Sequence, residues 1–153
     1  MMRWIVVALI ALAALVPQDA FAQKPAAQRQ VEPQKKGKLV FVAMTGLEDV
    51  GTLSSSFRHA KAAIESGHLE DVVWLAYGRA IVALDPTVKA VPEDVRKHAE
   101  AARKAGVRLV ACRQALKKYD IDEKKLVPPA EVTENAITEL ARLVAEGYQI
   151  IRY

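Results

Sequence analysis

Short apolar runs alternate along this chain with segments whose apolar residues recur at helical spacing. Residues 38–44 (KLVFVAM) and 71–77 (DVVWLAY) are typical of strands that are covered on both faces. Thr52 is a suitable N-cap for a helix between them, and Gly67 is a suitable stop. The apolar positions of that helix are Leu53, Phe57, Ala60 and Ile64. Strands that alternate with helices predict an α/β domain with a mainly parallel sheet.

The alternation continues to the C-terminus and predicts about five strands. Pro92 and the acidic residues after it open a helix that ends before Gly106. Residues 80–84 fit either a strand or a turn of helix. The other expected elements are a strand at 107–111, helices at 114–119 and 134–146 and a strand at 148–153, with Ala136, Leu140, Leu143 and Val144 facing inward. We expect a three-layer sandwich with helices on both faces and right-handed crossovers, whereas the direction and position of the last strand stay open.

Residues 1–22 have the form of a secretory signal peptide. A short basic start precedes an apolar run from Trp4 to Val16, and residues 20–22 (AFA) fit the small-x-small pattern before a cleavage site. The run is shorter than the roughly 20 residues that span a bilayer, so an uncleaved anchor is the weaker interpretation. We therefore expect cleavage after Ala22 and a periplasmic or secreted protein that is not held at a membrane afterwards.

The composition changes after the expected cleavage site. Residues 23–36 (QKPAAQRQVEPQKK) are rich in Gln, Pro and Lys and contain little to bury, which predicts a disordered tether. Residues 37–153 are then expected to form one domain with one core. The formal net charge of the chain is +4, but acidic and basic residues are interspersed without a basic stripe. We therefore expect no nucleic-acid partner.

Cys112 is the only cysteine of the chain, and it follows the apolar run at 107–111. In the oxidising compartment that export implies, a lone cysteine has no internal disulfide partner. Ligands of parallel sheets sit beyond the carboxyl ends of the strands, and Cys112 is expected at such an end. The residue is therefore either a working thiol at this edge or a small apolar residue packed in the core.

Residues that follow the other strands are expected to share this edge with Cys112. The backbone amides that open the next helix, together with nearby guanidinium groups, favour the thiolate form of a cysteine. We predict that Cys112 is a catalytic, partly exposed thiol. The binding residues expected around it are Thr45, Gly46, Gly78, Arg79 and Arg113. The three histidines have no metal-ligand spacing, so neither a metal nor another cofactor is expected.

Three segments resemble one family when their order and spacing are taken together. They are residues 77–84 (YGRAIVAL), 110–116 (VACRQAL) and 146–150 (EGYQI). In these segments the chain resembles the DsrE/DsrF-like (YchN-like) family, and the resemblance covers the whole domain from Lys38 to Tyr153. It implies a three-layer α/β domain that assembles into trimers or hexamers. It also implies that Cys112 matches a cysteine that carries sulfur as a persulfide and passes it to a partner protein.

The expected export departs from that family. Its sulfur-relay members act in the cytoplasm, so the resemblance supports the fold more strongly than the activity. The leading hypothesis is an exported homo-oligomer that accepts sulfane sulfur on Cys112 and donates it to a protein acceptor. The alternative is a non-catalytic oligomeric module that binds a ligand or partner at the same edge, with Cys112 in the core. An apolar patch left uncovered at residues 80–84, or at the edge of the last strand, would favour assembly.

Classical hydrolytic and redox chemistry is disfavoured by the same residues. A dithiol couple needs a second cysteine, which the chain lacks. The serines at 54–56 follow a loop without the G-x-S-x-G turn of a hydrolase or the glycine-rich pattern of a phosphate site. The sequence therefore concentrates its candidate chemistry on one thiol.

Overall fold

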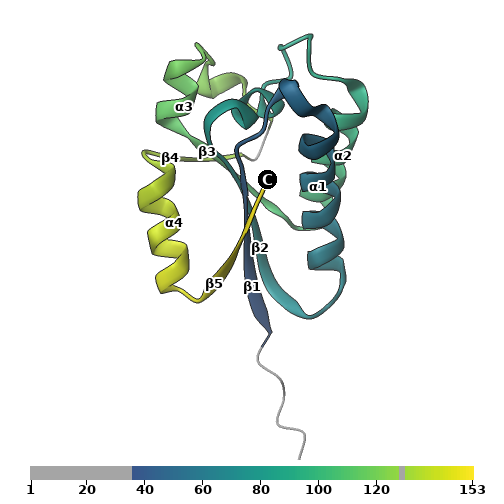
Figure 1. The fold of residues 1–153 in the computed structure, drawn as a ribbon, viewed down its shortest axis with the longest axis vertical. Coiled ribbons are helices and arrows are strands. Elements are labelled where there is room, and N and C mark those ends of the chain that lie inside the picture. The colour runs from purple at the N-terminus through teal and green to yellow at the C-terminus, as the bar shows by residue number, and fades with distance from the viewer. Residues whose placement is uncertain (1–35, 128–129) are drawn as a thin grey trace, which may run out of the picture. The chain divides into compact units, whose positions relative to one another are not determined.

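The apolar runs form the middle of a five-stranded sheet in which every neighbouring pair of strands is parallel. The strands are β1 (Gly37–Ala43), β2 (Leu69–Ala76), β3 (Arg108–Cys112), β4 (Glu131–Thr133) and β5 (Tyr148–Arg152). Their order across the sheet is β4-β3-β2-β1-β5 (Figure 1). This computed structural model describes residues 36–127 and 130–153, so the expected signal peptide and nearly all of the expected tether lie outside the described residues.

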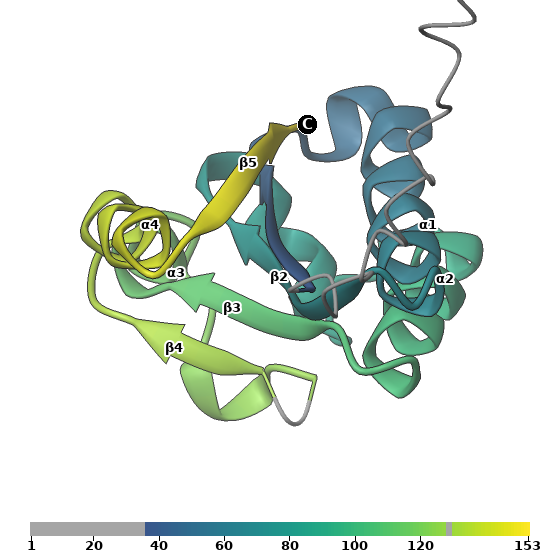
Figure 2. The ribbon, with the colours of Figure 1, turned by 90° about the horizontal axis from the view of Figure 1, so that it is seen from below.

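Helices cover both faces of the sheet, which confirms the expected three-layer sandwich. The α-helices are α1 (Val50–Glu65), α2 (Glu93–Lys104), α3 (Arg113–Lys118) and α4 (Ala136–Ala145). Short 3-10 helices are η1 (Leu47–Asp49), η2 (Gly78–Leu84) and η3 (Glu123–Lys125). In both ribbon views α1 and α2 lie on one side of the sheet, and α3 and α4 lie on the other (Figures 1 and 2).

Trp74 of β2 anchors α1 to the sheet. Its ring is fully buried and stacks on the ring of Phe57, with the two centroids 4.1 Å apart. The indole N–H donates a hydrogen bond to Ser56 Oγ at 2.9 Å, and that hydroxyl donates to the carbonyl of Leu53 at 2.7 Å. The polar atoms that enter the core with the ring are thus paired, which avoids the cost of an unsatisfied buried donor.

The start of α1 differs from the expectation. The helix begins at Val50, and Asp49 rather than Thr52 is its N-cap. The Asp49 carboxylate accepts hydrogen bonds from the Thr52 N–H at 2.9 Å and from its hydroxyl at 2.7 Å. The Thr52 N–H is the main reason why the pKa of Asp49 is lowered. A charged acceptor at this position also faces the positive end of the helix dipole.

The fifth strand is not where the sequence pattern offered one. Residues 80–84 belong to the 3-10 helix η2, whereas the extra strand is β4 beside β3. With three residues, β4 is too short for an alternating pattern to reveal it. The last strand, whose place the sequence left open, is β5, which runs parallel to β1 at the opposite edge of the sheet.

A row of polar side chains joins four strands at their amino ends. Arg108 of β3 donates hydrogen bonds to Asp71 of β2 at 3.0 Å and to both carboxylate oxygens of Glu131 in β4 at 3.0 and 2.8 Å. The hydroxyl of Tyr148 in β5 donates to Asp71. Arg108 lowers the pKa of Glu131, while burial and then Asp71 raise the pKa of Tyr148 to about 12. These side chains and Cys112 lie on the same face of the sheet, because alternate strand residues share a face.

Helix α4 buries a narrower stripe than its sequence pattern predicts. Ala136 and Leu143 are buried and Leu140 is half-buried, as expected for inward positions. Val144 was also expected to face inward, but its exposed fraction is 47%, so that prediction is wrong. The inward positions of this ten-residue helix therefore form a single row on one face.

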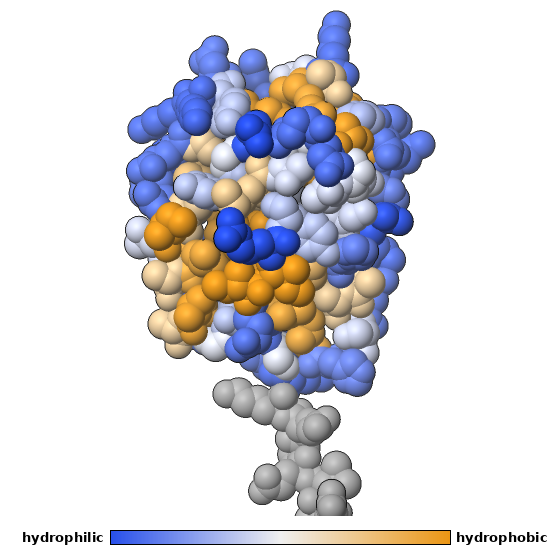
Figure 3. Space-filling model, in the orientation of Figure 1, coloured by the Kyte–Doolittle hydropathy of each residue, from blue (hydrophilic) through white to orange (hydrophobic). Residues whose placement is uncertain are grey.

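The exposed large apolar side chains of the described residues gather on α4 and β5. They are Ile137, Val144 and Ile150. Figure 3 shows a broad apolar area in this part of the surface. The expectation of an uncovered patch at residues 80–84 is wrong, because four of these five residues of η2 are buried and Val82 is half-buried. Among residues 36–127 and 130–153, no helix combines the length and apolar character needed to cross a membrane.

Candidate functional site

Cys112 is the last residue of β3 and directly precedes α3. It therefore lies at the carboxyl edge of the sheet, on the face that α4 covers. Only 2% of its surface is exposed, so the prediction of a partly exposed thiol is wrong. The sequence showed the end of the strand, but not that α3 and the start of α4 close over it.

A cavity of about 240 Å³ nevertheless reaches Cys112 from the surface. The residues that line it are Tyr77, Gly78, Cys112, Gln114, Ala115, Lys118, Asn135 and Ile137. They come from the junction of β2 and η2, the end of β3, helix α3 and the N-terminal end of α4. Cys112 is thus buried but lines a space large enough for a small molecule.

Local backbone features hold the walls of this cavity in place. Gly78 has a φ of +65°, a conformation that glycine adopts without the strain of a side chain, and it turns the chain sharply from β2 into η2. The Tyr77 N–H donates to the carbonyl of Ala43 at 2.8 Å, which extends the pairing of β1 and β2. On the other wall, the Asn135 side chain caps α4 by accepting from the Ile137 N–H at 2.8 Å.

The two arginines expected near the thiol are engaged elsewhere. Arg113 donates hydrogen bonds to both carboxylate oxygens of Glu123 at 3.0 and 3.2 Å, and it also pairs with Glu134. Arg79 donates to Glu48 at 2.7 Å. Each guanidinium therefore has its charge offset by carboxylate, and neither arginine lines the cavity. The charged lining residue is Lys118, a position that the sequence analysis did not select.

The loop after β1 forms a separate part of the same edge. At Gly46 a side chain would place its Cβ 2.7 Å from Cβ of Arg79, so the close approach of the two segments requires glycine. The Gly46 N–H donates to Glu48 at 3.0 Å, and this bond, ahead of Arg79, lowers the pKa of Glu48. Of the expected binding residues, only Gly78 shares the cavity with Cys112, whereas Thr45 and Gly46 lie outside its lining.

Several lining residues were not predicted from the sequence, for different reasons. Gln114 and Lys118 are one helical turn apart on α3, so helical periodicity could have placed both beside Cys112. Asn135 is a good helix N-cap that precedes an apolar helix, which is a readable pattern. Its position next to the thiol depends on β4, which pairs Cys112 with Thr133.

A comparison with protein-family models decides the family. The model of the DsrE/DsrF-like family matches residues 37–153. The chain belongs to this family. Members of the DsrE/DsrF-like family are associated with sulfur relay. No curated protein matches the sequence.

Solved structures share the fold of this DsrE-like domain. The ychN protein from E. coli is 19% identical, with a TM-score of 0.64, and the match covers 76% of this chain and 99% of that chain. Protein MTH1491 from Methanobacterium thermoautotrophicum, of unknown function, is 19% identical, with a TM-score of 0.59 and coverages of 78% and 100%. BT1422 from Bacteroides thetaiotaomicron, also of unknown function, is 15% identical, with a TM-score of 0.58 and coverages of 76% and 94%. At these identities the likeness establishes the DsrE-like fold.

Proposed function

We propose that this DsrE-like domain accepts sulfane sulfur on Cys112 and passes it to a partner protein. The observation that carries the proposal is the open cavity that borders the chain's only cysteine at the carboxyl edge of the sheet. Membership of a family associated with sulfur relay supports it further. A persulfide carrier needs a thiol that a small donor can reach and space for one additional sulfur atom, and the cavity supplies both.

The transfer requires no external oxidant when thiosulfate is the donor. The Cys112 thiolate attacks the outer sulfur of thiosulfate, a new S–S bond forms, and the old S–S bond breaks as its electron pair leaves on sulfite. Cys112 then carries a persulfide anion. In the second step an acceptor thiolate attacks the terminal sulfur, and the Cys112 thiolate is the leaving group.

The lining residues have complementary parts in this scheme. Lys118 supplies a positive charge beside the cavity, which favours an anionic donor and the persulfide anion. Gln114 adds a polar side chain that can hydrogen-bond to the donor. Burial of Cys112 keeps bulk water and larger oxidants away from the bound sulfur, while the exposed side chain of Ile137 offers an apolar contact for the acceptor protein.

Intact mass spectrometry after incubation with thiosulfate tests the proposal. The expected result is a gain of about 32 Da per chain, reversed by dithiothreitol and absent from the Cys112→Ser variant. Circular dichroism of the variant is the control that its fold is intact. A native protein that gains no sulfur from thiosulfate or from inorganic polysulfide would contradict the proposal, as would equal loading of the serine variant.

The second candidate is an oligomeric binding module in which Cys112 serves only as packing. The exposed fraction of 2% for Cys112 favours this alternative. It predicts that Cys112→Ser leaves assembly and partner binding unchanged. Capture of a partner that is equally strong with the serine variant, combined with no sulfur loading of the native protein, would decide for the binding module.

Export and self-assembly complete the proposed function. Cleavage after residue 22 would release the domain into the periplasm or the medium, so N-terminal sequencing of the exported protein should begin at Gln23. The exposed apolar side chains of Val144 and Ile150 supply a surface for a trimer or hexamer. Light scattering should give a trimeric or hexameric mass for the native protein, and Val144→Glu with Ile150→Glu should shift it to the monomer.

A further inference from the structure

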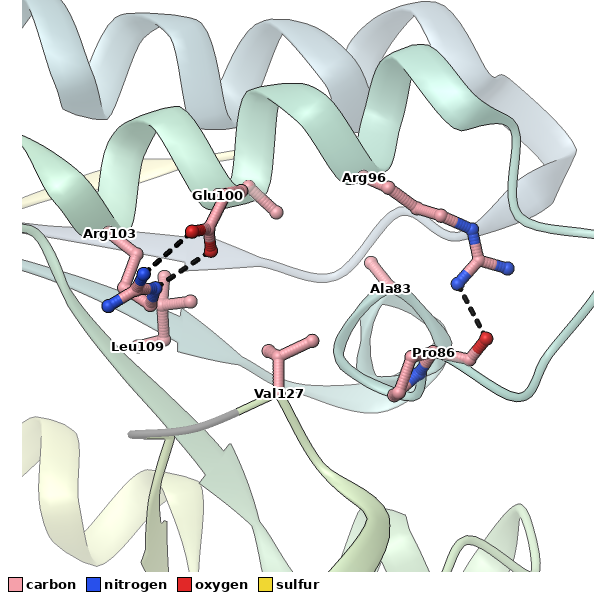
Figure 4. Close-up of a pocket in the computed structure, with 8 residues that line it drawn as sticks. Ala83, Pro86, Arg96, Glu100, Arg103, Leu109 and Val127 are labelled. Carbon is pink, nitrogen blue, oxygen red and sulfur yellow. Dashed lines mark hydrogen bonds and ion pairs between the residues drawn. The ribbon is translucent and has the colours of Figure 1, made fainter.

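A second cavity, of about 180 Å³, lies between α2, η2 and β3 (Figure 4). Its lining residues are Ala83, Pro86, Arg96, Ala99, Glu100, Arg103, Leu109 and Val127. It is on the other face of the sheet from Cys112, because Leu109 and Cys112 are three residues apart on one strand and so point to opposite faces. The two cavities share no lining residue.

Small side chains account for the space. Ala83 of η2, Ala99 of α2 and Leu109 of β3 are buried and line the cavity, and Figure 4 labels Ala83 and Leu109. Val127 completes the wall near β3, where its N–H donates to the carbonyl of Leu84 at 2.9 Å and so fixes the segment to η2. Two alanines in a core of larger residues leave an apolar hollow that a ligand of matching shape can fill.

The two arginines that line the cavity have different partners. Arg103 donates two hydrogen bonds to Glu100 at 2.8 and 2.6 Å, and this pair is the main reason why the pKa of Glu100 is lowered to about 2. Arg96, two turns earlier on α2, donates instead to the carbonyls of Pro86 at 2.8 Å and Val88 at 2.6 Å. Among the described residues Arg96 forms no ion pair. Its guanidinium is thus held in place by neutral acceptors, and no carboxylate offsets its positive charge in the described part of the chain.

We propose that this cavity binds a small carboxylate with a compact apolar body, with the carboxylate on Arg96. An arginine has five N–H donors, so Arg96 can keep its two carbonyl partners and still bind an anion. The hydrophobic body lies against Ala83, Ala99 and Leu109. An apolar cavity of about 150 Å³ accepts a benzene ring, so the volume here suits a body of about six carbon atoms. The site is independent of the sulfur chemistry at Cys112.

A titration of the isotope-labelled protein with benzoate, followed by amide NMR, tests this proposal. Benzoate should shift the amide resonances of Ala83, Ala99 and Leu109 at millimolar concentration. Benzamide has the same ring without the charge, and it should bind about tenfold more weakly because it loses the charge-assisted hydrogen bonds. This comparison uses only the native protein, so it needs no variant to fold.

Three variants locate the two parts of the site. Val127→Phe, at a half-buried position, should fill the cavity and abolish binding of both probes. Arg96→Gln should bind benzoate and benzamide equally, whereas Arg96→Lys should keep part of the preference for benzoate. Equal affinity of the native protein for the two probes would overturn the proposal. So would shifts confined to residues around Cys112, or no shift at the solubility limit of benzoate.

Discussion

The α4 face of the sheet has two ends with opposite character. At the amino ends of the strands, Asp71, Arg108, Glu131 and Tyr148 satisfy one another through hydrogen bonds and ion pairs across four strands. At the carboxyl end, Cys112 is more deeply buried, with an exposed fraction of 2%, but it borders a cavity. The comparison teaches that burial alone does not separate structural from reactive groups. What separates them is whether the buried group has a protein partner or an open space beside it.

The largest expected effect concerns the rate at which a small reagent reacts with a buried thiol. Val110 and Cys112 share a strand and a face, and each has an exposed fraction of 2%, but only Cys112 lines the cavity. Iodoacetamide should therefore alkylate native Cys112 on the order of a hundredfold faster than a cysteine at position 110 in the variant Cys112→Ser with Val110→Cys, which needs local unfolding to react. Mass spectrometry over time measures both rates. Similar alkylation rates at positions 112 and 110 would mean that the cavity gives Cys112 no special access to small reagents.

The next largest effect concerns the stability supplied by the paired side chains at the amino ends of the strands. Replacing Arg108 with Leu leaves Asp71 and Glu131 without their cation, and we expect a loss of about 1–2 kcal/mol in the free energy of unfolding. This figure allows for solvent screening, because about a third of the arginine side chain is exposed. Urea denaturation gives the measurement, and sulfur loading of Cys112 should be unchanged. An unchanged stability would mean that the row is a passive surface network.

The pH dependence of stability should reveal the paired end as well. Tyr148 has its pKa raised to about 12 in the folded protein, above the ordinary value of about 10. The unfolded chain therefore releases this proton first, so the stabilisation is complete below about pH 10 and is lost as the pH rises towards 12. The expected loss is on the order of 1 kcal/mol. Denaturation at a series of pH values gives the free energy of unfolding as a function of pH. Between pH 10 and 12 this free energy should fall more steeply for the native protein than for Tyr148→Phe, and equal slopes would contradict the assignment.

The smallest expected effect is electrostatic tuning of the cavity. Lys118→Gln should slow the loading of Cys112 by thiosulfate about threefold, since one exposed charge acts through solvent. High salt should slow the native protein but not the variant. Lys117→Gln is the matched control, because that neighbouring lysine does not line the cavity. If both variants load at the native rate, Lys118 has no part in attracting the donor.

Residues that form long periodic elements were predicted well from the sequence. The strands around Val40 and Val73 are buried on both sides and read as continuous apolar runs. Glu93 and Asp94 in the first turn of α2, with Arg103 and Lys104 in its last turn, marked both ends of that helix. Elements with little periodicity were predicted less well: β4 was missed, and residues 80–84, which the sequence left open between a strand and a turn of helix, belong to η2.

The candidate site was only half accessible from sequence. Cys112 and Gly78 follow strands, so the topology of a parallel sheet brings them to one edge. Arg79 and Arg113 follow strands too, but their side chains turn to the carboxylates of Glu48 and Glu123. Which way a long charged side chain turns depends on partners distant in the chain, and adjacency to Cys112 contains no information about them.

The sequence by itself determined the family, the α/β architecture and the position of the thiol at the end of a strand, because these follow from local periodicity and from motifs in a set order. Only the tertiary structure decided that Cys112 is buried, that Asn135 accompanies it, and that Arg96 lines a second cavity. The physical reason is that burial and charge pairing are properties of neighbours in space. Asn135, for example, follows β4 in the chain but lies beside Cys112 of β3.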